Sequence, residues 1–567
     1  MNMKIAYKKL LMSLALVALV ASGCDDELIE ANRNPDVLTN IAPENQFLSA
    51  TLSIHSQDFE AYYDFYRRIM PWMQYVTPLN GNGINFTNNV DNFSQRYGRL
   101  YTGIGDALTD VEQLIAKLPE EEQPRYTHMI AMARILKAFY TFYVSDIYGS
   151  IPYTEAWQAR YGGTLTPKYE DQPTLFAKLD SDIKAAMNTL KTAPPVSQVS
   201  LGNYDQYFRG DATAWVRAAN ALRLKIASRL IKRDPSAAQA IAQEVLGDAP
   251  EYLMSSNEEG WVLKSTASFV SGGNWNPDGL FAPKPLVDFM WDNNDPRLDA
   301  FVAPNGYSQA TIDVLIAEGE LEPGTTEAPR RYFGSFTSPD ASASAANQKY
   351  YTPRTATING ADTRVDTLSL IQRRLFQPSF DEGDGAGTGL VTIPVITYAD
   401  FCFMRAEFAA RDLTTEDAET FYNAGVTASI EWYDQLAVEG QLTNYTPLTD
   451  SEISDYLAQP GIAFDETIAL EQIACQAYIH FFRQPAEGWA SWKRTGFPNT
   501  TSVLALADMK SNGASLQVPR RAPLPLLNET FANYENQKAA YDAMAQDPGF
   551  GAGPTDAFGR VWWDVAQ

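Results

Sequence analysis

Apolar residues recur at helical spacing in several long stretches, and this periodicity constrains the fold more than any other feature of the sequence. One stretch is predicted to form a helix that begins after Pro124 and ends at Gly149. Its apolar face consists of Leu136, Phe139, Tyr140, Tyr143 and Ile147. The same spacing predicts helices over residues 211–231, 397–411 and 469–485, the first with Asp211 as N-cap.

Second helical patterns lie within a few residues of these stretches, at 100–118, 237–246 and 418–436. Small residues occupy the expected contact positions: Ala131, Ala133, Ala138, Ala218 and Ala219. Antiparallel helix pairs with small contact residues are typical of tetratricopeptide-like units, although no regular 34-residue repeat is present. We therefore predict a mainly all-α fold of degenerate tetratricopeptide-like helix pairs at about 95–250 and 397–495.

Residues 255–395 have a different composition, rich in Gly, Asn, Asp, Ser and Pro, with segments such as SGGNWNP and SPDASASAANQ. Short β-like runs such as Leu390 to Tyr398 interrupt them. We expect an irregular, loop-rich half with short β-hairpins that packs against the helix pairs. Long loops in a compact protein usually carry function, so ligand recognition is predicted in or beside this half.

The N-terminus has the features of a secretory signal over residues 1–23. Three lysines precede an apolar run from Leu10 to Ala21, which is too short to cross a bilayer core of about 30 Å. Cys24 follows Ser22 and Gly23, an arrangement that resembles a lipobox, although Ala21 stands where lipoboxes most often have Leu. We predict that Cys24 is lipidated; the alternative is an ordinary signal peptide with an incidental cysteine.

The segment after Cys24 is acidic and polar. Asp25, Asp26 and Glu27 resemble the export signal that directs Bacteroidetes lipoproteins to the cell surface, although a solvated tether would have the same composition. We predict a lipidated tether over 24–45, a single domain over 46–567, and an outer-membrane location facing the exterior.

Composition excludes several classes of function. The chain has 44 Lys and Arg against 69 Asp and Glu, a net charge of −25 that would repel nucleic-acid phosphates. Three cysteines, at 24, 402 and 475, cannot form a disulfide framework, and three scattered histidines cannot build a Cys/His zinc site. Cys402 and Cys475 lie on apolar helical faces and are predicted to be buried thiols. We expect no metal and no cofactor.

Several segments resemble the SusD/RagB family of nutrient-binding lipoproteins, specifically its SusD-like branch. They are NPDVLTN (34–40), DIYGSIPYTEA (146–156), WVRAANALRLKIASRL (215–230), NNDPRLDAF (293–301), TYADFCFMRAEFAAR (397–411), EGWASWKRTGFP (487–498) and VPRRAPLP (518–525). The resemblance implies a helical fold with four tetratricopeptide-like pairs packed against an irregular half. It also implies a surface lid on a SusC-like TonB-dependent outer-membrane transporter that captures oligosaccharides or, in RagB-like members, peptides.

The charged residues in two of these segments have a structural interpretation. Arg494 is placed to pair with a carboxylate such as Glu487 or Glu407. Arg520 and Arg521 lie between prolines, where such side chains commonly tie a loop to helix C-terminal carbonyls.

No catalytic motif is present: the sequence lacks G-x-S-x-G, H-E-x-x-H, a Walker A loop and a G-x-G-x-x-G between strand and helix. DEGDGAGTG (381–389) resembles a calcium loop but has Gly at positions 3 and 5 and no Glu at position 12, so calcium is not expected. Because acidic residues are abundant, an α-helical glycoside hydrolase stays an alternative, but we predict a binding protein and no enzyme.

Neutral glycans are held by flat aromatic platforms with amide or carboxylate hydrogen bonds around them. Candidate platforms are Trp72 and Tyr75, and Trp275 with its neighbours Asn274 and Asn276. Tyr307 and Tyr332 are weaker additions. Each of these aromatics could instead be core. Trp275, flanked by Gly and Asn, is the sharpest candidate, and the aromatic content favours oligosaccharide over peptide.

Overall fold

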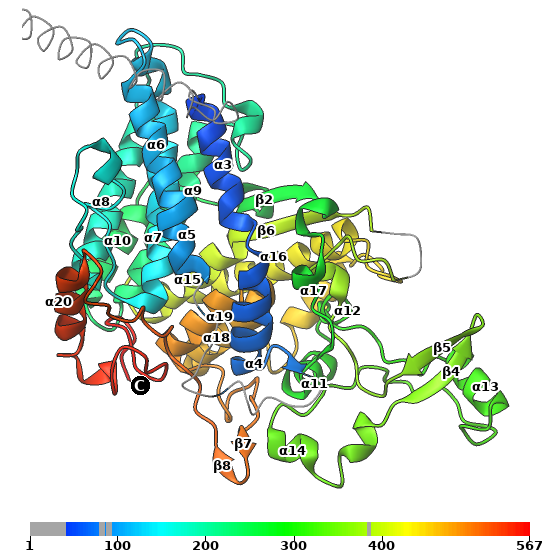
Figure 1. The fold of residues 1–567 in the computed structure, drawn as a ribbon. Helices are drawn as coiled ribbons and strands as arrows, with labels where there is room; N and C mark the ends of the chain where they lie inside the picture. The colour runs from blue at the N-terminus through cyan, green and yellow to red at the C-terminus, as the bar shows by residue number, and fades with distance from the viewer. Residues whose placement is uncertain (1–40, 79–85, 87–92, 94, 383–386, 567) are drawn as a thin grey trace, which may run out of the picture.

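The computed structural model describes residues 41–78, 86, 93, 95–382 and 387–566. The predicted signal, Cys24 and nearly all of the predicted tether lie outside these residues, as does the middle of the segment 381–389. In the part of the chain that is described, helices dominate, and named strands occur in four two-stranded antiparallel sheets. The predicted fold class, helix pairs packed against an irregular half, is confirmed (Figure 1).

The helical body consists of helices that pack in neighbouring pairs. The pairs are α7 (Thr127–Tyr148) with α8 (Gln172–Lys191), α9 (Ala212–Leu230) with α10 (Pro235–Leu246), α15 (Tyr398–Ala410) with α16 (Ala418–Glu439), and α18 (Ala469–His480) with α19 (Pro485–Thr495). A further pair, α3 (Pro43–His55) with α6 (Gly105–Ala116), was not anticipated from the sequence. Its first helix begins inside the segment predicted as tether.

Shorter helices connect these pairs. They are the π-helices η1 (Glu60–Ile69) and η3 (Leu100–Ile104), and α4 (Met70–Trp72), α5 (Gln95–Arg99), α11 (Lys284–Asp292), α12 (Leu298–Phe301), α13 (Gln309–Ala317), α14 (Pro339–Ala343), α17 (Asp450–Leu457) and α20 (Tyr534–Met544). The π-helix η1 matters most for function, because it carries side chains into a cavity described below.

Local sequence explains where the long helices begin and end. Helix α7 ends at Gly149, whose φ of 78° suits glycine and whose N–H bonds the carbonyl of Ser145 at 2.8 Å. At the start of α9, the Asp211 carboxylate accepts a hydrogen bond from the N–H of Ala214 at 3.0 Å. Both boundaries match the sequence-based predictions.

Antiparallel strand pairs organise the loop-rich half. Strands β2 (Trp261–Thr266) and β6 (Leu390–Ile396) place Thr266 opposite Leu390, so the chain enters and leaves this half at one point. The other pairs are β1 (Thr77–Pro78) with β3 (Leu280–Phe281), β4 (Arg354–Ile358) with β5 (Ala361–Val365), and β7 (Lys510–Ser511) with β8 (Ala514–Ser515). The hairpin β4–β5 projects from the body together with α13 (Figure 1).

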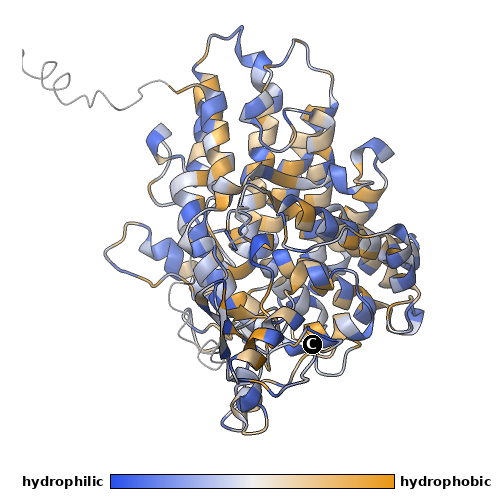
Figure 2. Ribbon diagram, turned by 90° about the vertical axis from the view of Figure 1, so that its right-hand side faces the viewer, coloured by the Kyte–Doolittle hydropathy of each residue, from blue (hydrophilic) through white to orange (hydrophobic). Residues whose placement is uncertain are grey.

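One large apolar core runs through the helical body and into the loop-rich half. Hydrophobic residues concentrate along the packed helices, and hydrophilic residues gather at the connecting loops (Figure 2). Cys402 and Cys475 are buried free thiols, as predicted, and burial raises the pKa of each to about 12. Neither thiol is therefore ionised at neutral pH.

Buried arginines join segments that are distant in sequence. Arg297 in the loop-rich half pairs with Asp295 at 2.6 Å and donates to Ser429 of α16 at 3.0 Å and Gln476 of α18 at 2.9 Å. Of the two carboxylates proposed for Arg494, the structure selects Glu407. Arg520 and Arg521 each bond a backbone carbonyl. Arg520 donates to the carbonyl of Lys493 in the last turn of α19, and Arg521 donates to the carbonyl of Asp556.

Candidate functional site

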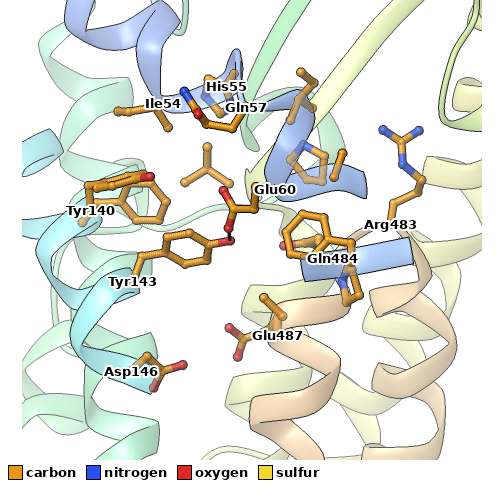
Figure 3. Close-up of a pocket in the computed structure, with 18 of the residues that line it drawn as sticks. Ile54, His55, Gln57, Glu60, Tyr140, Tyr143, Asp146, Arg483, Gln484 and Glu487 are labelled. Carbon is orange, nitrogen blue, oxygen red and sulfur yellow. Dashed lines mark hydrogen bonds between the residues drawn. The ribbon is translucent and has the colours of Figure 1, made fainter. Parts of the chain in front are cut away.

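Two of the hollows in the described part of the chain are considered as ligand sites, and each is large enough to hold a ligand. The first, which we call the loop-half groove, has a volume of about 570 Å³ and lies between α14, the turn Gln348–Tyr351 and the hairpin β7–β8. The second, which we call the interhelix cavity, has a volume of about 190 Å³ and lies between η1, α7, α9 and the start of α19 (Figure 3).

The loop-half groove combines two adjacent tyrosines with polar side chains. Tyr351 is fixed, because its hydroxyl accepts a hydrogen bond from the N–H of Phe336 and bonds the Ser335 hydroxyl, both at 3.0 Å. Tyr350 is half-buried, with its ring 6.1 Å from that of Phe336 and 5.0 Å from the Lys349 ammonium. Other lining residues are Asp340, Ser342, Gln348, Arg364, Asp366 and Asn512.

The charged groups of the groove are satisfied within the protein. Arg364 forks onto Asp366 with two hydrogen bonds of 2.8 Å. Asp340 accepts the backbone N–H groups of Asn512 at 2.7 Å and Gly513 at 2.8 Å, which ties the hairpin β7–β8 to α14. The groove therefore offers hydrogen-bonding groups without a strong excess charge, a chemistry suited to neutral hydroxylated ligands.

Carboxylates gather at one end of the interhelix cavity, where Figure 3 shows Glu60, Asp146 and Glu487. Glu60 accepts a hydrogen bond from the Tyr143 hydroxyl at 2.6 Å and pairs with Arg96 at 3.1 Å. Arg229 lies between Asp146 and Glu487, with a closest contact of 2.9 Å to each.

Lys225 adds a second cation 3.3 Å from Glu487. Burial acts to raise the pKa of Glu487, but Arg229 and Lys225 outweigh it and hold that pKa below its usual range. Because each carboxylate has a cationic partner, this end of the cavity stabilises the fold and offers no free acid or base.

The rest of the cavity wall is mostly apolar and aromatic. Phe65, Tyr66, Phe139, Phe142, Val270, Trp275 and Phe376 contribute to it. His55 also lines it, but its imidazole bonds the Tyr207 hydroxyl at 2.7 Å, and burial lowers its pKa to about 3. The imidazole is therefore neutral at physiological pH.

Trp275, the sharpest sequence candidate, lies on the wall of the interhelix cavity and outside the groove. It is half-buried, and its carbonyl accepts a hydrogen bond from Tyr66 at 2.9 Å. Asn274 donates to Asp58 at 2.8 Å, whereas Asn276 has a buried carbonyl oxygen with no partner in the described chain. Asn274, Trp275 and Asn276 thus lie together, and the structure does not bring the other predicted ligand-binding residues together with them into one site.

Trp72 and Tyr75 belong to the core, which contradicts their prediction as ligand platforms. Trp72 is 1 % exposed and packs against Phe93 and Trp489. Tyr75 is fully buried, stacks on Tyr478 with ring centroids 4.3 Å apart, and donates to the Tyr478 carbonyl. Tyr478 of α18 and Trp489 of α19, far along the chain, help to cover these two rings, so neither ring face is available to a ligand.

Tyr307 and Tyr332 line neither hollow. Tyr307 packs against a small separate core of Leu315, Ala356 and Val365. Tyr332 packs against Trp291 and donates to Asp299 at 2.6 Å.

Tyr350 and Tyr351 were not among the residues predicted from the sequence, although they share the feature that singled out Trp275. They are aromatic residues within a polar part of the loop-rich half, in the segment ANQKYYT. That criterion, applied to every aromatic of the half, would have found them.

Among the described residues, two features are absent. No group of three or more His, Cys, Asp or Glu side chains is arranged to hold a metal ion there. None of the helices in these ranges combines the length and apolarity that a membrane span requires.

Comparisons with known proteins place this architecture among relatives. A SusD-like family model, described as starch-binding and associating with the outer membrane, matches residues 35–319 and 325–525. Among curated proteins, no match was found.

Solved structures share the fold at low sequence identity. A chitin-binding protein superposes with a TM-score of 0.69 at 22 % identity, covering 93 % of this chain and 100 % of the other. A SusD-like protein of Bacteroidetes AC2a superposes with a TM-score of 0.65 at 23 % identity, with the same coverage of both chains. A chitin-binding SusD homologue from Flavobacterium johnsoniae superposes with a TM-score of 0.61 at 18 % identity, covering 92 % of this chain and 98 % of the other.

Proposed function

Because this chain belongs to the SusD-like family of starch-binding proteins that associate with the outer membrane, we propose that it captures oligosaccharides at the cell surface. We place the captured oligosaccharide in the loop-half groove. The observation that carries this assignment is the pairing of Tyr350 and Tyr351 with polar, internally neutralised side chains in a groove of about 570 Å³.

The groove matches the two surfaces of a sugar ring. The C–H face of a pyranose would stack on the half-buried ring of Tyr350, displacing the flexible Lys349 side chain. Hydroxyl groups would bond Gln348, Asn512 and the phenol of Tyr351, which is protonated at neutral pH and whose pKa burial raises further. A volume of this size lies within the usual range of ligand pockets.

Delivery would depend on a partner and an anchor. We propose that a SusC-like TonB-dependent transporter receives the glycan, with this protein acting as its lid. Cys24, lipidated, would hold the body at the outer membrane, and the tether that follows would allow the lid to open. The family match and the resemblance of residues 21–24 to a lipobox support this arrangement.

The proposed role is binding without catalysis. Groove carboxylates that a glycosidase would need are engaged, Asp366 by Arg364 and Asp340 by two backbone N–H groups. Incubating the mature protein with the glycan that it binds should release no reducing ends. Hydrolysis that disappears in an Asp340→Asn variant would instead support the glycosidase alternative.

Calorimetric titration of the mature protein with starch and chitin oligosaccharides, and with peptide mixtures, tests the proposal directly. We expect saturable binding of an oligosaccharide and roughly tenfold weaker binding by Tyr350→Ala, because one stacking surface of about 1.5 kcal/mol is lost. Tyr204→Ala removes an exposed tyrosine ring outside the groove and should leave affinity unchanged. Peptide binding without glycan binding would overturn the assignment in favour of the RagB-like alternative.

A pull-down from detergent-solubilised outer membranes tests the partner. A tagged copy of this protein should recover a large β-barrel transporter in comparable amount. Recovery of the tagged protein alone under several mild detergents would contradict the lid proposal and leave glycan capture unaffected.

A further inference from the structure

A buried hydroxyl group on the lining of the interhelix cavity lacks a hydrogen-bond partner. Tyr140 of α7 is almost fully buried and contributes to this lining. Its hydroxyl makes no hydrogen bond within the described part of the chain. Burial raises the pKa of Tyr140, so the hydroxyl keeps its proton and is available as a donor. A buried donor without an acceptor costs free energy, and a bound ligand can remove that cost.

Two buried acceptors on the same lining are only partly used. The Oε1 atom of Glu60 accepts from the Tyr143 hydroxyl at 2.6 Å and lies 3.1 Å from Arg96, whereas its Oε2 atom accepts no hydrogen bond from the described residues. Gln57 donates through Nε2 to the Ser53 carbonyl at 3.1 Å, and its Oε1 atom likewise accepts none from them. Both side chains line the cavity, so each has an oxygen left for a ligand.

The unused donor and the unused acceptors belong to neighbouring elements. Figure 3 shows Gln57 and Glu60 with Tyr140 among the side chains around one cavity. The ring of Tyr140 lies 5.7 Å from that of Tyr143, which itself bonds Glu60. A hydroxyl group donates one hydrogen bond and accepts others, so a single ligand hydroxyl is complementary to such a combination.

The charges on the lining favour a neutral ligand. Three carboxylates and three cations contribute to it: Glu60, Asp146, Glu487, Lys225, Arg229 and Arg483. Because these charges are balanced in number, an anion or a cation brought into the cavity would add an unmatched charge. A neutral ligand avoids that cost and still finds the free oxygen of Glu60.

We propose that the interhelix cavity binds a small neutral phenol, separately from the glycan proposed for the loop-half groove. The phenol hydroxyl accepts a hydrogen bond from Tyr140 and donates one to the free oxygen of Glu60, and the ring packs against the apolar wall. Hydrogen bonds to a carboxylate are stronger than those between neutral groups, and a phenol is a good donor. Phe65 and Trp275 on this wall are only partly buried, so the cavity reaches the surface.

Size and lining select this ligand class. A dry cavity of about 150 Å³ lined by apolar side chains is enough to bind benzene, so about 190 Å³ accommodates one ring with a hydroxyl group. A sugar of similar size carries several hydroxyl groups, and most polar groups of this lining are already engaged with one another. A hydrocarbon fits the wall but leaves the Tyr140 hydroxyl without a partner.

Calorimetric titration of the mature protein with phenol, and with toluene as an isostere that lacks the hydroxyl, tests the site. We expect phenol to bind saturably and at least about tenfold more tightly than toluene. Toluene is the more hydrophobic of the two, so apolar transfer alone predicts the opposite order. Tyr140→Phe should weaken phenol binding at least about fivefold and leave toluene binding unchanged. Tyr204→Phe removes an exposed hydroxyl outside the cavity and should change neither affinity.

A second variant locates the binding. Ala61 lies on the cavity lining, so Ala61→Leu should fill part of the space and abolish phenol binding. Ala177→Leu adds the same atoms at an exposed position of α8 outside the cavity and should retain it.

Tyr140→Phe removes a hydroxyl without a partner in the described chain, so it should fold and decide the question even where Ala61→Leu does not fold. Equal affinity for phenol and toluene, no saturable phenol binding at millimolar concentration, or unchanged phenol affinity in Tyr140→Phe would each overturn the proposal. Oligosaccharide binding to Tyr140→Phe, measured in parallel, should match that of the unmodified protein. The phenol site and the proposed glycan function can therefore fail independently.

Discussion

Arg229 illustrates how single buried charges support this fold. It is almost fully buried and bonds both Asp146 and Glu487 through its guanidinium. Replacing it by Gln leaves two carboxylates without their main partner, so we expect a loss of about 3–5 kcal/mol in the free energy of unfolding. Urea denaturation followed by tryptophan fluorescence measures this loss.

A matched control comes from the exposed pair Lys178 and Asp182, which lie one helical turn apart on α8. Lys178→Gln should change stability by less than about 0.5 kcal/mol, because exposed pairs of this kind contribute little. Similar losses in the two variants would contradict a special role for the buried network.

Lys493 makes the stability dependent on pH. Its ammonium is fully buried, lies 3.9 Å from the centre of the Trp489 ring, and donates to the Arg520 carbonyl. Burial lowers its pKa from 10.5 to about 7. Between these values the unfolded chain binds one more proton than the folded chain, so stability rises with pH by up to about 1.4 kcal/mol per unit.

The measurement is urea denaturation at pH 7, 8 and 9, below the range in which tyrosines ionise. Relative to a Lys493→Met variant, the unmodified protein should gain stability as pH rises. Parallel pH curves for the two proteins would show that Lys493 is not deprotonated in the folded state.

Individual residues also mark the limit of sequence-based prediction. The Gly and Asn neighbours of Trp275 correctly indicated that this side chain is not fully buried. The residues next to Trp72 in the sequence did not indicate that Trp72 is buried. Trp72 is covered by Trp489, a contact that only the folded chain creates. The pairing of Arg229 with Asp146 and Glu487 was likewise invisible, because its partners come from α7 and α19.

At the level of the element, Asp211 caps α9 with a side chain that remains exposed. Asp211→Ala removes the acceptor for the Ala214 N–H and should lower the free energy of unfolding by about 1 kcal/mol. Asp211→Asn keeps an acceptor, so its free energy of unfolding should stay within a few tenths of a kcal/mol of that of the unmodified protein. Equal losses in both variants, measured by urea denaturation, would point to the charge and away from the cap.

Periodicity predicted the long helices well and the short irregular ones poorly. Helices α7, α9, α15 and α18 have one continuous apolar face, and their predicted ranges hold within a few residues. The segment EAYYDFYRRI forms the π-helix η1, whose buried residues include Glu60 and Asp64. A search for apolar residues at α-helical spacing does not detect an element that buries carboxylates and has a different period.

At the scale of the whole molecule, attachment to the membrane depends on Cys24 in the proposed function. A Cys24→Ala variant cannot be acylated, so it should leave the outer-membrane fraction and appear among soluble proteins. Fractionation followed by immunoblotting measures the distribution, with Cys402→Ala as a control because that thiol is buried in the body. Retention of Cys24→Ala on the outer surface would contradict the anchor.

The strand pair β2–β6 has a consequence for how such proteins can diversify. It brings Thr266 and Leu390 together, and Arg297 fastens the intervening chain to α16 and α18. Insertions or replacements between Val302 and Leu370 that spare these attachments, the bond of Thr337 to Gln74 and the contacts of Asp340 with the hairpin β7–β8 would not need to disturb the packing of the helix pairs. Ligand specificity could thus change through mutations in one stretch of the gene while the packing of the helix pairs stays the same.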